Sequence, residues 1–266
     1  MNFRAEAILL ALNHVSSNYR DEEPLQIVEV GCMFKEDEGF STYLIADFLA
    51  KRAGCGRFVS IEYDLSHIDA SRVLIQKWNP GLSGLIEYRH GHSLSVLPEV
   101  LTDLDQVHFF YLDGGAHPEV CLAEFEKAMM HLAPEGVILV DDAQQIPPSK
   151  NYQLPRPLGK ATLILPMLIV ANYLLNRETV STANATPGNQ RSIPQSRFVG
   201  QLENIDIPSL NAGNFEVIGS GHQMLAYGSP TFLAKARKLS QAVKPADIGL
   251  HSLITVVKRK IGRFVS

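Results

Sequence analysis

The sequence predicts an α/β fold: a doubly wound, mostly parallel sheet of seven strands that ends in an antiparallel hairpin. Two observations predict it. From residue 25, short apolar runs alternate with stretches of helical period, which is typical of a parallel sheet covered by helices on both faces. Near the end of the chain, two further apolar runs flank residues 219–221 (Gly-Ser-Gly), and so tight a connection predicts antiparallel pairing at the sheet edge.

The elements follow in order along the chain. The expected strands are residues 25–30, 57–61, 85–89, 107–112, 136–140, 215–218 and 224–227. The helices expected between the first five strands are residues 41–53, 66–78, 94–101 and 118–132. In the first of these helices the apolar residues recur on one face. The turn Ala133-Pro-Glu-Gly136 is expected to stop the last one.

Composition narrows the class of protein. The 266 residues are 45% hydrophobic and 20% charged, which suits one globular domain with an appendage or two small domains. The net charge of −4 argues against nucleic acid as a partner. Residues 1–23 predict an amphipathic helix and not a signal peptide. The apolar segment 161–175 is too short to span a membrane and contains Pro166. We therefore expect a cytoplasmic protein with reduced cysteines.

Two regions lie outside the repeating pattern. We expect residues 1–228 to form the main domain, with 144–213 as an insertion or lid over the site, because so long a connection is rare in a compact domain. Residues 229–266 predict a C-terminal helical extension of two helices. The last helix combines an apolar stripe with basic residues, so we expect it to dock on the domain or on a second subunit of a homodimer or higher homo-oligomer. A peripheral membrane contact is the alternative.

Three segments predict a nucleotide-type ligand site at the carboxyl ends of the strands, where such sheets bind ligands. The first comprises Glu29 to Gly31, followed by a glycine-containing turn that opens a helix whose N–H groups can face an anion. The second ends the next strand with an acidic residue that can accept hydrogen bonds from ribose hydroxyls. The third segment, residues 91–93, follows the expected strand 85–89 and lies within reach of an adenine ring. The candidate residues are Glu29, Gly31, Gly39, Ser41, Glu62, Tyr63, His92 and Ser93.

The motifs as a set resemble a known family. The matching strings are Val28-Glu-Val-Gly31, Phe58-Val-Ser-Ile-Glu62, Gly91-His-Ser-Leu-Ser-Val-Leu-Pro98, Leu112-Asp-Gly114 and Ala133-Pro-Glu-Gly-Val-Ile-Leu-Val-Asp-Asp142. They resemble the Rossmann-like class I S-adenosylmethionine-dependent methyltransferases, and within them the catechol O-methyltransferase-like branch that includes natural-product sugar O-methyltransferases. The resemblance covers roughly half of the chain and implies S-adenosylmethionine as cofactor, with Asp113 among its contacts. Residues 32–38 make the glycine turn about four residues longer than is usual in the family.

Three carboxylates end the fourth and fifth strands: Asp113, Asp141 and Asp142. Like charges this close need a cation or shared protons. Mg²⁺ or another divalent ion would satisfy them, and it would hold an acceptor hydroxyl and lower its pKa. The same positions match the acidic metal ligands of the resembled branch. In the alternative interpretation, Asp113 contacts the cofactor or caps a helix, while Asp141 and Asp142 form ion pairs.

His117, four residues after Asp113, is the candidate general base, because its ordinary pKa lies near neutrality. A helix-capping or solvent-facing histidine is the alternative, and His92 is the second choice of base. Residues of the insertion are expected to line the acceptor pocket, with Tyr152, Arg156, Tyr173 and Phe198 as candidates.

These features together predict a metal-assisted O-methyltransferase that acts on a small hydroxylated acceptor of secondary metabolism, such as a sugar or a phenol. Two alternatives stay open. One is a metal-independent methyltransferase of another acceptor. The other is a non-catalytic binding protein with the same fold.

Overall fold

The sheet contains seven strands in the order β3-β2-β1-β4-β5-β7-β6. The structure is a computed structural model that describes residues 3–36, 40–52, 56–114, 117–143, 159–162, 164, 215–218 and 224–242. The strands are β1 (Leu25–Val30), β2 (Gly56–Glu62), β3 (Ile86–His90), β4 (Val107–Leu112), β5 (Leu132–Val140), β6 (Phe215–Ile218) and β7 (Met224–Tyr227). Strands β1 to β5 pair in parallel, and β7 runs antiparallel to both β5 and β6. The expected fold class is confirmed.

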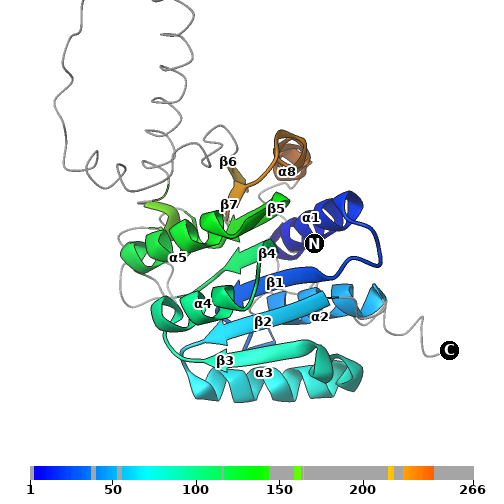
Figure 1. The fold of residues 1–266 in the computed structure, drawn as a ribbon, viewed down its shortest axis with the longest axis vertical. Coiled ribbons are helices and arrows are strands. Elements are labelled where there is room, and N and C mark those ends of the chain that lie inside the picture. The colour runs from blue at the N-terminus through cyan, green and yellow to red at the C-terminus, as the bar shows by residue number, and fades with distance from the viewer. Residues whose placement is uncertain are drawn as a thin grey trace, which may run out of the picture.

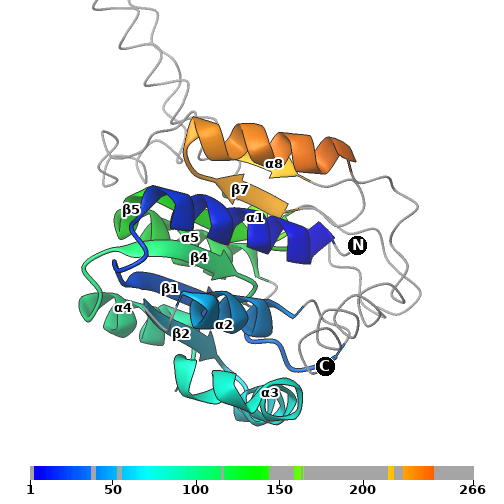
Figure 2. The same ribbon diagram turned by 90° about the vertical axis from the view of Figure 1, so that its right-hand side faces the viewer.

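Helices cover both faces of this sheet (Figures 1 and 2). They are α1 (Phe3–Asn18), α2 (Ser41–Lys51), α3 (Leu65–Trp78), α4 (Ser93–Thr102), α5 (Pro118–Met130) and α8 (Pro230–Ala242), with short 3-10 turns η1 (Pro80–Leu85) and η2 (Lys160–Thr162). Helices α1, α2, α3 and α8 share one hydrophobic core with the sheet, and α4 and α5 share the other.

The two cores follow from the alternation of side chains along each strand. In β4, Phe109 and Tyr111 enter the core under α1 and α2, whereas Phe110 and Leu112 enter the core under α4 and α5. All four are fully buried. A parallel strand with helices on both faces is therefore apolar at consecutive positions, which is why β4 reads as a continuous apolar run.

Helix α1 belongs to the core layer. It packs against α2, α8, β4 and β5. Its buried stripe includes Ile8, Leu12 and Val15. Helix α8 is the first of the two helices expected after residue 229, and it buries Phe232 in the same core. The second of those helices lies outside the described residues. No helix among the described residues is long and apolar enough to cross a membrane.

The end of α5 differs from the prediction. The helix stops at Met130, and β5 begins at Leu132 instead of residue 136. Val107 pairs with Leu132, and the register then shifts so that Phe109 pairs with Val137. The expected turn at residues 133–136 is therefore an irregularity inside the strand, because the start of β4 holds the preceding residues at the sheet.

Candidate functional site

The carboxyl ends of the strands are joined into one row by backbone hydrogen bonds. Four N–H groups at or just beyond a strand end donate to the carbonyl of a neighbouring strand, over 2.8 to 3.0 Å. They belong to Gly31, Gly91, Asp113 and Asp141. The pairing of the strands thus fixes the backbone at the ends of β1, β3, β4 and β5, where predicted site residues lie.

Gly31 is required by this row. Its φ of +88° lies in the left-handed region. A Cβ atom at this position would lie 2.5 Å from the carbonyl oxygen of Asp113. The chain after β1 can pass the end of β4 this closely only because residue 31 has no side chain.

Glu29 lies on β1, two residues before this row, and is linked by hydrogen bonds to the beginning of the lengthened loop 32–38. Its carboxyl group is fully buried and accepts hydrogen bonds from Thr42 Oγ1 (2.8 Å) and Ser60 Oγ (2.6 Å). Thr42 Oγ1 in turn accepts a hydrogen bond from the backbone N–H of Met33 (2.9 Å). Burial raises the pKa of Glu29 to about 7, although hydrogen bonds from Ser41, Ser60 and Thr42 oppose the shift.

The beginning of the loop 32–38 is held against β2 and α3. The backbone N–H groups of Cys32 and Asp64 donate to the two carboxylate oxygens of Glu62, over 3.2 and 2.9 Å. The Phe34 ring stacks on His67 with 3.6 Å between ring centroids. The carboxylate predicted to hold a ribose thus also positions the loop after β1. Gly39 lies outside the described residues.

The ends of β2 and β3 present an aromatic edge. Tyr63 is 71% exposed, and its ring lies edge-on to His92 with 5.9 Å between centroids. His92 is exposed and caps α4, since its Nδ1 accepts a hydrogen bond from the N–H of Leu94 (3.2 Å). The predicted cofactor contacts Tyr63 and His92 therefore lie together and open to a ligand.

Ser93 is hydrogen-bonded to Glu124, a residue that was not predicted to belong to the site. Its hydroxyl donates to Oε1 of Glu124, a fully buried residue of α5. Oε2 of Glu124 has no hydrogen-bond partner among the described residues. Burial raises the pKa of this carboxyl to about 7. A Cβ atom at Gly114 would lie 3.1 Å from Oε1 of Glu124. The signal was a glutamate on the apolar face of a helix, beside Phe125 and four residues before Ala128.

The three predicted carboxylates lie together, and two cations lie between them. Asp141 is fully buried and pairs with Arg4 (2.6 Å). Lys160 pairs with Asp113 (2.5 Å) and lies 3.8 Å from Asp142. Arg4 also lies 3.8 Å from Asp113. The alternative in which Asp141 and Asp142 form ion pairs agrees with this arrangement, and Asp113, for which it proposed a cofactor contact or a helix cap, is ion-paired as well.

The electrostatics of the group follow from its burial. Burial raises the pKa of Asp113 to about 6, with Lys160 acting in the opposite direction. Burial by itself would lower the pKa of Lys160, but the surrounding carboxylates outweigh it and keep this pKa above its ordinary value. Tyr111 contributes a neutral donor, since its hydroxyl donates to Asp141 over 2.9 Å.

Arg4 and Lys160 were not among the predicted site residues. Arg4 precedes Ile8 by one helical turn and so lies on the buried stripe of α1, which was a readable signal. Lys160 lies within the predicted insertion and carried no signal, because only the fold returns the chain to the end of β5. The backbone N–H of Lys160 donates to the carbonyl of Asp142 (2.9 Å).

The residues present do not fit a metal centre. Among the described residues, no group of three or more His, Cys, Asp or Glu side chains is arranged to hold a metal ion. Each of Asp113, Asp141 and Asp142 has a protein cation within 4 Å. Arg4 and Lys160 thus already supply the two positive charges that a divalent ion would carry.

His117 is exposed at the start of α5, at the loop after β4. Its side chain makes no capping hydrogen bond to the helix. This geometry matches a solvent-facing histidine and leaves the ring accessible to a ligand. The four residues proposed to line the acceptor pocket (Tyr152, Arg156, Tyr173 and Phe198) lie outside the described residues.

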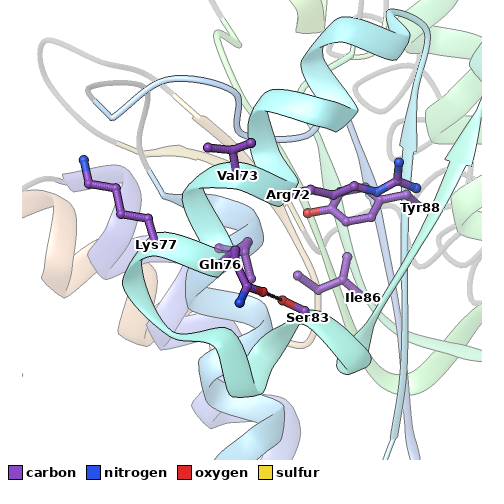
Figure 3. A pocket seen from close by; sticks show the side chains of 8 residues that line it. Arg72, Val73, Gln76, Lys77, Ser83, Ile86 and Tyr88 are labelled. Carbon is purple, nitrogen blue, oxygen red and sulfur yellow. Dashed lines mark hydrogen bonds between the residues drawn. The ribbon is translucent and has the colours of Figure 1, made fainter.

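Away from these strand ends, a hollow lies at the outer edge of the sheet, between α3, η1 and β3 (Figure 3). Arg72 covers the ring of Tyr88 at 5.3 Å, and Ser83 donates to Gln76 over 3.2 Å. The hollow contains none of the residues predicted to form the site.

The sequence matches a family model over the segment that builds this site. The model is that of a methyltransferase domain, and the match extends over residues 28–143. Residues 28–143 are thus similar to a methyltransferase domain. The matched segment runs from β1 past the end of β5 and contains every residue predicted to hold the cofactor or a metal, together with His117. The strand order agrees with the doubly wound fold class expected from the sequence.

Solved structures similar to this chain include an O-methyltransferase from Bacillus cereus in complex with SAH. The two are 16% identical, with a TM-score of 0.46, over 85% of this chain and 80% of the other. Cofactor-bound Rv0187 from MTB is 17% identical, with a TM-score of 0.43, over 84% and 79%. The O-methyltransferase TomG from Streptomyces achromogenes, in complex with SAM, is 16% identical with a TM-score of 0.42, over 84% and 79%. No curated protein matches the sequence.

Proposed function

We propose that this protein is an S-adenosylmethionine-dependent O-methyltransferase that acts on a hydroxyl group of a small metabolite. The observation that carries the proposal is the row of residues at the carboxyl ends of β1 to β5, within the segment that matches the methyltransferase domain. In this proposal Gly31, Glu62, Tyr63, His92 and Ser93 hold the cofactor. Glu29 supports them from below through Thr42, and Gly39 and Ser41 complete the cofactor site.

Ribose recognition is assigned to Glu62, which lies at the end of β2 with its carboxylate partly exposed. The adenine is assigned to the aromatic edge formed by Tyr63 and His92, because an exposed ring offers a stacking surface. Asp113, one position past β4 and beside Gly31, is assigned as a further contact of the cofactor.

Methyl transfer requires little covalent participation by the protein. The acceptor oxygen attacks the methyl carbon in line with the departing sulfur, and holding the two in this geometry supplies much of the rate. The hydroxyl proton leaves to a base, for which accessible His117 is our candidate. A homo-oligomeric assembly, a cytoplasmic location and a role in secondary metabolism stay predictions.

Titration of the protein with S-adenosylmethionine in a calorimeter tests the cofactor assignment. We expect one site per chain, and we expect Glu62→Ala to weaken it by at least about tenfold, which corresponds to 1.4 kcal/mol. Glu87→Ala, a change on the neighbouring strand, is the control and should bind as the wild type does. Absence of binding at millimolar cofactor would refute the proposal and favour the non-catalytic alternative.

Transfer itself is tested with labelled S-adenosylmethionine and a panel of sugars, phenols and amines. Label found on hydroxyl oxygens supports the proposal, whereas label found on amines alone contradicts it. Running each reaction with EDTA and with added Mg²⁺ tests the predicted metal.

A further inference from the structure

Two side-chain cations compensate most of the negative charge of the three carboxylates. Asp113, Asp141 and Asp142 carry three negative charges when ionised, and Arg4 and Lys160 carry two positive charges. Mg²⁺ would supply the same two positive charges through a few carboxylate ligands. The protein cations therefore perform the charge compensation for which the sequence predicted a metal.

Position supports the same conclusion as charge. One oxygen of Asp113 faces Lys160 Nζ at 2.5 Å, and the other faces an Arg4 nitrogen at 3.8 Å. Arg4 continues to Asp141 at 2.6 Å, and Lys160 continues to Asp142 at 3.8 Å. Both oxygens of the central carboxylate are thus directed at side-chain cations, where a metal would need at least one of them.

Both cations are anchored by the fold. Lys160 has a side chain only 5% exposed, and its backbone N–H donates to the carbonyl of Asp142. The next residue, Ala161, donates to the carbonyl of Ala143 over 3.1 Å and is fully buried. Arg4 is carried on α1, whose stripe is packed in the core. These pairs are therefore fixed and partly desolvated, unlike mobile pairs on a surface.

We propose that Lys160 and Arg4 take the place of the divalent ion, so that this methyltransferase works without a metal. The statement about methyl transfer without a metal rests on the proposed function. The statement that Lys160 and Arg4 neutralise the carboxylates does not. The two side chains supply positive charge beside the acceptor oxygen as it loses its proton. Lys160, which bridges the ends of β4 and β5, is the group on which exclusion of the metal depends.

The first test measures metal binding and is independent of activity. Mn²⁺ is titrated into the EDTA-treated full chain and followed by electron paramagnetic resonance. We expect the wild type to show no stoichiometric binding up to about 1 mM, and Lys160→Ala to bind at least about tenfold more tightly, because it removes the lysine that pairs with Asp113 and lies beside Asp142. Lys160→Arg, which keeps the charge, should exclude Mn²⁺ like the wild type. Lys77→Ala, which removes a surface lysine paired with Glu36, is the matched control.

One tightly bound Mn²⁺ per wild-type chain would overturn the inference, and this result needs no variant to fold. Equal Mn²⁺ affinity of the wild type and a folded Lys160→Ala variant would also overturn it. The second test measures transfer. We expect the wild-type rate to change less than about twofold with EDTA, and Lys160→Ala to lose at least about tenfold. Loss of wild-type transfer in EDTA that Mg²⁺ restores would refute the inference, whereas failure to bind S-adenosylmethionine would refute only the proposed function.

Discussion

Buried carboxyl groups are the most unusual residues of this protein. Glu29 and Glu124 are fully buried on opposite sides of the row of strand ends, and burial raises the pKa of each to about 7. Both accept hydrogen bonds from hydroxyl groups, which a protonated carboxyl can also satisfy. At neutral pH these two groups therefore titrate in the folded protein, although they are fully ionised in the unfolded chain.

This shift predicts how stability depends on pH. The unfolded chain loses the Glu124 proton near pH 4.5, and the folded protein keeps it until about pH 7. Between these values the folded state binds more protons, so the free energy of unfolding falls as pH rises through the window. Glu124→Gln should remove about 3 kcal/mol of this fall. Urea unfolding at pH 5 and pH 8 measures it.

The control for that experiment is Glu119→Gln, which changes an exposed glutamate of the same helix and should leave the pH dependence as it is. A Glu124→Gln variant with the pH dependence of the wild type would show that this carboxyl is ionised when buried.

Gly31 gives a second prediction at the level of one residue. Gly31→Ala should lower the free energy of unfolding by about 2 kcal/mol or more, because it combines a positive φ with a contact of 2.5 Å to a backbone oxygen. Gly84→Ala is the control: an added Cβ there meets nothing within 4 Å, and its φ is not positive. Equal stability of the two variants in urea unfolding would contradict the prediction.

At the level of elements, α1 has two functions. It covers the sheet beside α2 and α8, and it carries Arg4 to the carboxylates at the ends of β4 and β5. Helix α1 therefore supplies a positive charge to the site in addition to packing against the sheet.

Arg4→Ala should destabilise the protein by about 3 kcal/mol, because Asp141 would stay buried and lose the arginine with which it pairs. Adding Asp141→Asn should restore part of the loss, since the buried charge is then removed as well. Arg20→Ala removes the arginine of an exposed pair and should change stability little. Thermal unfolding of the three variants and the wild type measures these changes, and an Arg4→Ala variant as stable as the Arg20→Ala variant would contradict the assignment.

At the level of the whole molecule, residues from both ends of the described chain close the same core. Helix α8 packs against α1, so the first and last described helices lie side by side (Figure 2). His14 of α1 and Phe232 of α8 are in ring contact, 5.4 Å between centroids. The core layer on this face is therefore complete only when α8 docks.

Phe232→Ala should accordingly destabilise the entire domain by about 3 to 5 kcal/mol, since it opens a cavity in a fully buried position. Calorimetry should show one transition shifted down by roughly 10 °C. Val73→Ala, at a position 66% exposed on α3, should leave the transition in place. An unchanged main transition in Phe232→Ala would show that α8 is not part of the cooperative unit.

The sequence was sufficient to predict the strands, the order of the site segments and three carboxylates at strand ends, because these features depend on local periodicity and on the rule that parallel strands end at one edge. It placed the boundary between α5 and β5 wrongly, since pairing with β4 decides it. Only the tertiary structure decided what neutralises the carboxylates. Arg4 and Lys160 lie more than 100 residues apart in the chain, and they meet at Asp113 because α1 and η2 both return to the ends of β4 and β5.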